Sequence, residues 1–394
     1  MYGKEARFGG LRGLPLDDIL VPTPSMIIDQ GILYNNVERA KKRAKELGVT
    51  LRPHLKTHKS IEIARWQMES DKGPATVSTI KEARFFAANG IMDMIYAVTI
   101  CPQKLPDIAE IRQTGVDMKV VVDSVEGAKI VSEFCHKWTL WIPVLIEIDC
   151  DGHRSGLKPN DPTIVEVARA CTNGAVPKGV ITHAGESYHS LTPELIKVAA
   201  ENEVKAINMA AKMLRDAGFR CPIVSTGSTP TFMMLDHKPE GVTEMRPGTY
   251  ALGDLFMMNL GVLNLEDIAG SVLTTVIGHQ RAKGQVICDA GWNALSQDRG
   301  TAQQAIDFGY GLVCDLHGKP LRNMEVRVTA TNQEHGIITA VSGEPLRPED
   351  FPIGSRLRIL PNHICATMAR YNKLVFLGVD ETITKVVPHL SGWS

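Results

Sequence analysis

The feature that most limits the fold of this 394-residue chain is an alternation of short apolar segments with amphipathic helical segments between residues 49 and 250. Strands that alternate with helices favour a parallel sheet covered by helices. Eight such repeats are enough to close the sheet, so we predict an α/β chain with a (β/α)8 barrel. The expected strands cover residues 49–56, 75–79, 93–98, 118–124, 144–149, 179–183, 223–227 and 243–248.

Residues that begin and end helices lie between these strands. Thr192 is a natural N-cap, and Pro193 after it suits the first helical position. The helical segment 81–89 is followed by Gly90, a residue that often ends helices. These signals support the barrel interpretation.

The pattern changes after about residue 265, where strand-like runs are separated by turns and show little helical period. This pattern of short strand-like runs and turns predicts a second, mainly β domain. We therefore expect the barrel over residues 25–262 and a β-rich domain built from residues 1–24 and 263–394. The strand-like segment Pro24–Asp29 has no place in the eight-strand count and is a candidate to pair with the β domain.

Composition limits the partners and the compartment. The net charge of −1 gives no field that would recruit nucleic acid or an anionic membrane. No apolar run reaches the roughly 20 residues of a membrane span, and residues 1–7 lack the apolar core of a signal peptide. The eight cysteines form no CxxC pair, which favours reduced thiols and a cytoplasmic location.

The densest chemical signature is Arg52–Lys59, which holds two lysines and two histidines in the sequence RPHLKTHK. Its Lys56 closes the first predicted strand, at the end of the barrel where active sites lie. Neighbouring cations and partial burial favour the neutral amine, which can form a Schiff base with a carbonyl group. The alternative is a solvated basic turn.

Hydroxyl-bearing residues follow the seventh strand in Ser225–Thr231, and Arg246–Tyr250 closes the eighth. These two loops are the usual phosphate-binding region of such barrels. A phosphate site together with a strand-end lysine suggests pyridoxal 5′-phosphate, held by its phosphate and bonded through its aldehyde. A plain turn is the alternative for the hydroxyl-rich segment alone.

Three further polar residues follow predicted strands. Arg154 is a candidate to bond the phenolic oxygen of the cofactor ring, with a surface salt bridge as its alternative. His183 and Tyr188 are candidates for places beside the ring or the substrate. A histidine at a strand end is also often structural, so this alternative stays open.

In the β domain, His363 and Cys365 stand two residues apart in the sequence PNHIC. In an extended strand both would point to the same face. Imidazole and thiolate together favour zinc, and two protein ligands completed by water and substrate suit a catalytic site. Gln333–Gly336 is a second polar cluster, either an outer layer around that metal or a turn.

These motifs, taken in order, resemble the D-serine dehydratase and D-threonine aldolase group of fold-type III pyridoxal phosphate enzymes. The resemblance covers about residues 22–394 and is strongest to the metal-activated dehydratase branch. It implies an alanine racemase-like barrel with a β domain and a head-to-tail homodimer. The motifs that carry it are RPHLKTHK, DGHRSG, THAGESY, STGSTPT, RPGTY, DAGW, QEHG and PNHIC.

The resemblance also implies roles for individual residues. Lys56 would bind the cofactor covalently, and Arg154 would face its phenolic oxygen. His363 and Cys365 would bind a divalent metal, usually zinc, with Mn²⁺, Co²⁺ or Mg²⁺ as alternatives. The expected catalytic set is Lys56, Arg154, His183 and Tyr188, and the residues expected around the cofactor also include Ser228, Thr229, Gly248 and Thr249.

The implied activity is dehydration of D-3-hydroxy amino acids such as D-serine, D-threonine and D-threo-3-hydroxyaspartate to a 2-oxo acid and ammonia. The metal would act as a Lewis acid on the β-hydroxyl group. The alternative is an aldolase that cleaves the Cα–Cβ bond and yields glycine and an aldehyde. Aldolase members carry an aspartate near the metal histidine, where this chain has Ile364-Cys365-Ala366. Racemisation and a non-catalytic cofactor carrier are lesser alternatives.

Overall fold

The structure is a computed structural model that describes residues 10–393. The chain divides into two compact units, one formed by residues up to Val37 with Thr249–Gly392 and the other by Glu38–Gly248 with Trp393. Residues 1–7, on which the signal-peptide expectation depends, lie outside the described part. No helix of that part is long and apolar enough to cross a membrane.

The unit Glu38–Gly248 is built around an eight-stranded parallel sheet in which strands adjacent in sequence are adjacent in space. A bridge between His54 and Thr76 joins the first strand to the second, and Thr50 pairs with Glu244 of the last strand. The sheet therefore closes on itself, and the predicted barrel is confirmed. The strands are β2 Thr50–Leu51, β3 Ala75–Val77, β4 Asp93–Thr99, β5 Asp117–Val122, β6 Ile142–Ile148, β7 Ala175–Thr182, β8 Ile223–Thr226 and β9 Glu244–Met245.

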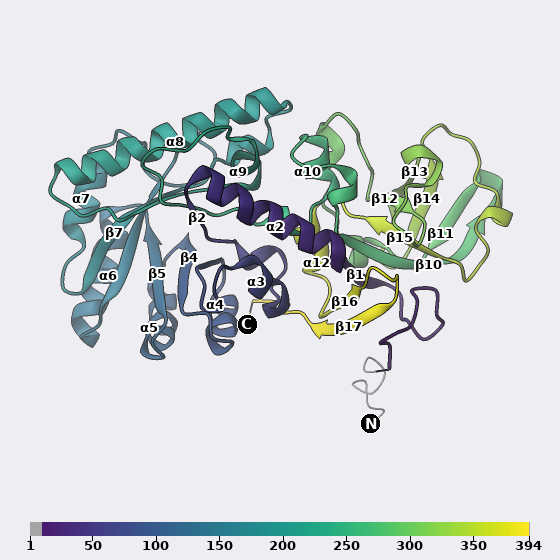
Figure 1. Cartoon of the computed structure of the whole chain (residues 1–394), viewed down its shortest axis with the longest axis horizontal. Coiled ribbons are helices and arrows are strands. Elements are labelled where there is room, and N and C mark those ends of the chain that lie inside the picture. The colour runs from purple at the N-terminus through teal and green to yellow at the C-terminus, as the bar shows by residue number, and fades with distance from the viewer. Residues whose placement is uncertain (1–9, 394) are drawn as a thin grey trace. The chain divides into compact units, whose positions relative to one another are not determined.

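Helices connect these strands, with α5 and α6 on one side and α7 and α8 on the other in the view of Figure 1. The predicted caps are confirmed: the Thr192 side chain accepts the N–H of Leu195 at 3.3 Å, and Gly90 takes a φ of +91° beyond α4. The helices are α2 Gln30–Leu47, α3 Ile61–Gln67, α4 Ile80–Ala88, α5 Leu105–Gln113, α6 Val125–Trp138, α7 Thr163–Ala170, α8 Pro193–Asp216 and α9 Thr229–Met234.

A chain of buried charges links strands across the barrel. The Arg52 guanidinium bonds Asp93 on one side (Nη1–Oδ1, 2.8 Å) and Glu244 on the other (Nε–Oε2, 2.8 Å). Lys119 also reaches Asp93 at 2.7 Å. Ser225 donates to Glu244 at 2.6 Å, so each buried charge has a partner. Burying Arg52 and Glu244 costs desolvation energy, and loss of Arg52 would leave the Glu244 carboxylate buried without the guanidinium that pairs with it.

The other unit contains a nine-stranded, mainly antiparallel sheet, as the predicted β domain requires. The strands are β1 Ser25–Asp29, β10 Gly270–Gln280, β11 Gln285–Cys288, β12 Leu312–Cys314, β13 Val326–Thr331, β14 Gly336–Ala340, β15 Arg356–Leu360, β16 Lys373–Leu377 and β17 Ile383–Pro388. Its short helices are α10 Leu255–Asn259, α11 Trp292–Leu295 and α12 Ile364–Met368.

The segment that had no place in the barrel count pairs with this β sheet. β1 runs antiparallel to β10, with Ile27 opposite Ser271, and parallel to β16, with Ile28 opposite Phe376. Its apolar side chains are fully buried there. Residues 25–37 and 249–262, which we expected in the barrel domain, therefore belong to the β unit in the structure.

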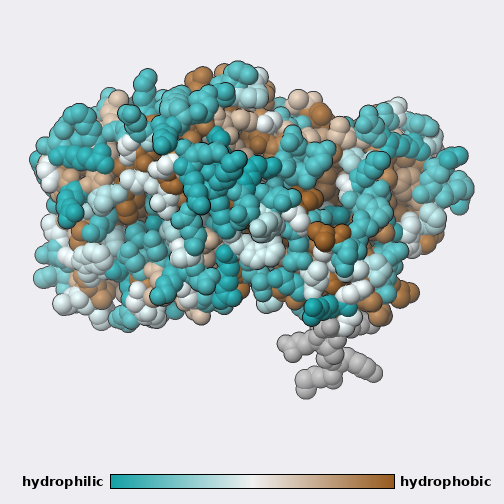
Figure 2. All heavy atoms as spheres, viewed as in Figure 1, coloured by the Kyte–Doolittle hydropathy of each residue, from teal (hydrophilic) through white to brown (hydrophobic). Residues whose placement is uncertain are grey.

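The visible face of the molecule is largely hydrophilic, and apolar residues are scattered over it in small groups (Figure 2). Scattered apolar residues are ordinary on protein surfaces.

We predict that Arg52→Ala destabilises the barrel by about 3–5 kcal/mol, because it leaves Asp93 and Glu244 without their common partner. Arg84→Ala is the matched control, since Arg84 also bridges two carboxylates but is 47% exposed. That change should cost no more than about 1 kcal/mol. Urea unfolding of both variants measures the difference, and equal losses would contradict the assignment.

Candidate active site

Lys56 lies on a tight turn just beyond the first barrel strand. The predicted strand 49–56 is wrong in its length: β2 ends at Leu51, although the N–H of His54 still donates to the carbonyl of Pro247 at 2.9 Å. A 3-10 turn, Leu55–Thr57, follows. Leu55 and Thr57 are buried while Lys56 is exposed, so the turn is anchored and its amine remains accessible.

Gly248 lies against this turn at the end of the last strand. A Cβ atom there would lie 3.1 Å from both the His54 carbonyl oxygen and the Thr57 hydroxyl, closer than side chains normally pack. The N–H of Gly248 donates to the hydroxyl of Thr229 at 3.2 Å. The structure therefore brings together the lysine turn, Thr229 and Gly248. Thr249, the next residue in the chain, begins the second segment of the β unit.

The loop after β8 forms the predicted hydroxyl-rich segment. Gly227 has a φ of +144°, and a Cβ there would stand 2.4 Å from the backbone nitrogen of Arg246. Ser228 caps α9, and its hydroxyl accepts the N–H of Thr231 at 3.2 Å. The buried hydroxyl of Thr226 has no hydrogen-bond partner among the described residues. An open backbone beside an unsatisfied hydroxyl donor fits the phosphate of pyridoxal phosphate.

Glu203, a fully buried carboxylate on α8, holds this loop in place. It accepts the N–H groups of Gly227 at 2.9 Å and Ala184 at 3.1 Å, and the hydroxyl of Thr231 at 2.8 Å. Burial raises the pKa of Glu203, and these donors oppose the rise. The residue thus fastens the loop after β8 to the loop after β7.

Our sequence analysis missed Glu203, although a signal was present. The residue stands on the apolar face of α8, where Ile196, Ala200 and Ile207 are buried at helical spacing. A carboxylate on such a face needs buried donors.

His183 points one ring nitrogen at the same loop. Its Nδ1 lies 2.7 Å from the carbonyl oxygen of Gly227, which can only accept, so Nδ1 carries the proton and Nε2 is an acceptor. Burial, together with the charges of Lys56 and Arg246, lowers the pKa of His183 to about 3. The ring of Tyr188 lies beside it, with centroids 5.9 Å apart.

The surroundings of Lys56 are positively charged. Burial, with Lys56 and Arg246 nearby, also lowers the pKa of His54 well below its ordinary value. Arg154 adds to the positive potential at His183 and lies 3.6 Å from Glu147, with its side chain 57% exposed. Cationic groups that gather around one position favour an anionic ligand such as a phosphate ester.

The structure corrects the setting of the predicted metal ligands in the β unit. His363 and Cys365 do not lie on a strand: β15 ends at Leu360, before Pro361, which has no N–H to continue the ladder. His363 is the N-cap of α12, and Cys365 lies in its first turn. The turn nevertheless brings the imidazole and the sulfur within hydrogen-bond distance.

Asp298 orients His363. Its Oδ2 lies 2.7 Å from Nδ1 of the imidazole, which assigns the proton to Nδ1 and leaves Nε2 for a metal. Burial opposes the imidazolium, but the charge of Cys365 and the hydrogen bond to Asp298 outweigh it and raise the pKa of His363. Imidazole, thiolate and an outer carboxylate fit a borderline-soft divalent ion.

The sequence offered no reason to single out Asp298 within its segment, 65 residues before His363. The other polar cluster, Gln333–Gly336, forms the turn between β13 and β14, as its alternative interpretation expected. Its Glu334 accepts a hydrogen bond from Asn293 at 2.6 Å.

Two protein families match the chain. The alanine racemase N-terminal domain matches residues 28–255, and the putative serine dehydratase domain matches residues 269–377. D-threo-3-hydroxyaspartate dehydratase of Delftia sp. (strain HT23) is 45% identical over 95% of this chain and 99% of its own length. D-serine dehydratase of Dictyostelium discoideum is 31% identical over 92% of this chain and 94% of its own.

Solved structures agree with these matches. The Delftia dehydratase superimposes with a TM-score of 0.93 at 44% identity, covering 96% of this chain and 100% of that one. Two variants of that enzyme replace a histidine and, two positions later, a cysteine, and the cysteine variant is in the metal-free form. D-threonine aldolase from Filomicrobium marinum reaches a TM-score of 0.81 at 25% identity, covering 96% of this chain and 97% of that one.

We predict that Glu203→Ala destabilises the protein by about 3 kcal/mol or more, because three buried donors lose their acceptor. The affinity for pyridoxal phosphate should also fall by at least about tenfold, since the loop after β8 loses its anchor. Thermal unfolding and equilibrium dialysis measure the two effects. Glu201→Ala, an exposed carboxylate on the same helix, should change stability by about 0.5 kcal/mol or less.

We also predict a pH dependence that arises from His183. Its pKa is about 3 in the folded protein and 6.5 as a model value, so the unfolded chain binds the proton more tightly. Stability is therefore complete above pH 6.5 and falls as the pH drops toward 3, by at most about 1.4 kcal/mol per pH unit. His183→Gln should make the loss shallower in urea unfolding between pH 7 and about 4.

His317 provides the comparison, because the hydrogen bond that its imidazole donates to the Glu381 carboxylate raises the pKa of His317. A raised pKa stabilises the protein as the pH falls, so His317→Gln should leave the acid loss as steep as before or steeper. If both variants behave alike, His183 is not the group responsible.

Proposed function

The chain belongs to the alanine racemase and D-serine dehydratase-like family, and from this premise we propose that it dehydrates D-3-hydroxy amino acids with pyridoxal 5′-phosphate and a divalent metal. The products are a 2-oxo acid and ammonia, and the substrates are D-serine, D-threonine and D-threo-3-hydroxyaspartate. The prediction of a carbon–oxygen lyase of the dehydratase type is confirmed by the family membership.

The observation that carries this proposal is the Asp298–His363–Cys365 arrangement. A barrel lysine beside a phosphate site accounts for the removal of a proton from Cα, which a racemase also needs. Loss of hydroxide from Cβ is a further demand, because hydroxide is a poor leaving group. When bound, pyridoxal phosphate stabilises negative charge at Cα and the metal withdraws electrons from the β-hydroxyl oxygen.

We assign the cofactor to the mouth of the barrel. Lys56 would hold it covalently through its exposed amine, and that amine is also our candidate base for the Cα proton. Ser228, Thr229 and Gly248, together with the adjoining Thr249, would surround the phosphate.

Two aromatic side chains and Arg154 complete this assignment. His183 presents its unprotonated Nε2 and lies beside Tyr188, so both rings are candidates to contact the cofactor or the substrate. Arg154 would face the phenolic oxygen. Its side chain is 57% exposed and lies 3.6 Å from Glu147, so we expect it to be able to turn toward the cofactor.

We assign the metal to Nε2 of His363 and the sulfur of Cys365. Asp298 keeps the proton on Nδ1, so the nitrogen that faces the metal is ready to coordinate. Zinc is the ion we propose, since it accepts imidazole and thiolate in one shell and leaves positions for water or substrate. Mn²⁺, Co²⁺ and Mg²⁺ remain as alternative ions.

The same proposal includes a cytoplasmic homodimer. None of the eight cysteines, all of which lie in the described part of the chain, forms a disulfide, which suits a reducing compartment. The dimer is what the family resemblance implies, and analytical ultracentrifugation of the purified protein tests it.

The product formed from D-threo-3-hydroxyaspartate, D-serine and D-threonine tests the activity. We expect 2-oxo acid and ammonia in equal amounts, whereas glycine with an aldehyde would establish the aldolase alternative. Lys56→Ala should abolish the visible absorbance of the bound cofactor and lower kcat by at least about 10³-fold. Lys59→Ala is the matched control, because Lys59 is paired with Glu82 at 3.4 Å and should keep that absorbance.

Cys365→Ala tests the metal assignment in the same assay. It should weaken metal binding by about 100-fold or more and remove dehydration with it. Cys101→Ala, another part-exposed thiol, should leave metal content and products unchanged. Full dehydration by a metal-free Cys365→Ala enzyme would overturn the Lewis-acid role.

A further inference from the structure

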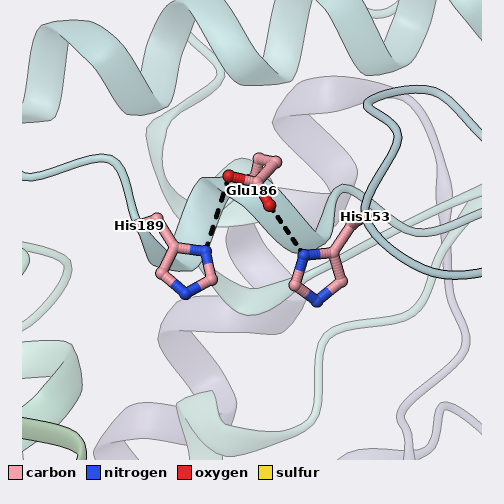
Figure 3. A group of neighbouring side chains, drawn as sticks. All are labelled: His153, Glu186 and His189. Atoms are coloured by element: carbon pink, nitrogen blue, oxygen red, sulfur yellow. Dashed lines mark hydrogen bonds and ion pairs between the residues drawn. The ribbon is translucent and has the colours of Figure 1, made fainter.

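His153, Glu186 and His189 form a compact cluster on the barrel unit, separate from the groups assigned above. Glu186 stands between the two imidazoles and offers one carboxylate oxygen to each (Figure 3). Nδ1 of His153 lies 2.7 Å from Oε1, and Nδ1 of His189 lies 3.5 Å from Oε2. All three ligand atoms lie within 4.8 Å of one another, and all three residues are exposed.

These separations fit a small divalent ion. Two ligands about 2.05 Å from a tetrahedral zinc ion lie about 3.3 Å apart. Each imidazole Nδ1 lies near that distance from one oxygen of the same carboxylate, 2.7 Å from Oε1 and 3.5 Å from Oε2, so both histidines and Glu186 can reach one ion once these exposed side chains adjust. Two imidazoles and one carboxylate, completed by water, form a common zinc ligand set.

The backbone holds the ligands in position without any ion. The carboxylate of Asp151 accepts the N–H of Glu186 at 2.9 Å and that of His153 at 3.2 Å, so it ties the two ligand-bearing loops together. Gly185 lets the His153 ring lie against the backbone, because a Cβ there would stand 2.2 Å from the ring. Preorganised ligands lower the entropic cost of binding.

A second exposed cluster of similar composition shows the contrast. Glu201, Asp236 and His237 also lie within reach of one ion, but Lys197 is paired with Asp236 at 3.2 Å. The ammonium group of Lys197 therefore already neutralises part of the negative charge of that cluster. Among the described residues, the ion pairs of Glu186 are only those with its two histidines.

We propose that His153, Glu186 and His189 bind a second divalent transition metal, of the zinc or cobalt class, with water in the open position. The site joins the loop after β6 to the 3-10 turn Gly185–Tyr188. Arg154 follows one ligand in sequence and Tyr188 precedes another, so the ion restrains the two loops that carry these residues. The proposal does not depend on the function proposed above, because its ligands are not those assigned to catalysis.

Cobalt titration of the chelator-treated holoenzyme distinguishes the two metal sites. Wild type should bind two Co²⁺ per chain, one with a thiolate-to-cobalt absorption band from Cys365 and one without it. Cys365→Ala should lose the band and keep one Co²⁺. A double variant with His153→Ala and His189→Ala should keep the band and lose the other Co²⁺, with an affinity reduced by more than about 100-fold.

His237→Ala is the matched control from the other exposed cluster and should still bind two Co²⁺. Because all the substituted histidines are exposed, thermal unfolding should confirm that each variant is folded. A wild type whose bound Co²⁺ all shows the thiolate band, or a double variant that binds as much Co²⁺ as wild type, overturns the proposal. Absence of the thiolate band in wild type would count against the Cys365 site alone and leave this one standing.

Discussion

Closure of the barrel between its first and last strands, each only two residues long, is the constraint on which the rest of the unit Glu38–Gly248 depends. β2 is only two residues long, yet the backbone N–H groups of Arg52 and His54 continue its pairing with the last strand. The carbonyl of Pro53 accepts the N–H of Thr76 at 2.9 Å and joins the other neighbour. A slip of one residue would turn the side chain of Arg52 away from its carboxylates. The register that buries Arg52 is therefore also the one that sets the position of Lys56.

Among the basic side chains of the barrel unit, some keep their proton at neutral pH and others lose it. Burial lowers the pKa of Arg246 to about 10, so its guanidinium stays protonated at neutral pH. The same surroundings lower the pKa of His183 to about 3, so its imidazole stays neutral. A fixed cation and a neutral acceptor thus lie close to one lysine. This combination can attract a phosphate ester without placing further positive charge beside the reacting amine.

The barrel was predictable from sequence because each strand and helix carries its own periodicity and caps. Each of the eight observed strands overlaps its expected range, although β2 ends at Leu51 rather than at residue 56. Sequence predicted the structure less well where contacts between distant segments determine the local conformation. The HxC pair lies on a helix start, because Pro361 ends the strand and Asp254 accepts the N–H of Ile364 at 3.0 Å. Asp298 and Glu203 could not be assigned partners, since their contacts come from segments far apart in the chain.

The loops at the mouth of the barrel are restrained unevenly. The exposed cluster of His153, Glu186 and His189 lies where the restraint is weaker. Glu203 holds the loop after β8 and the start of the loop after β7 through buried hydrogen bonds, which solvent does not weaken. The loop after β6 is anchored at its start, where buried Cys150 packs against Ala184 and Ala206 and its carbonyl accepts a hydrogen bond from Asn202 at 2.8 Å. The part that carries Arg154 is joined to its neighbour through Asp151, His153 and Glu186. Exposed ion pairs of this kind contribute little by themselves. A metal held by the same side chains would restrain this part of the loop further, because coordination bonds are far stronger than an exposed ion pair. If the proposed metal binds, it restrains the segment around Arg154, whereas Glu203 holds the loop after β8 through the fold itself.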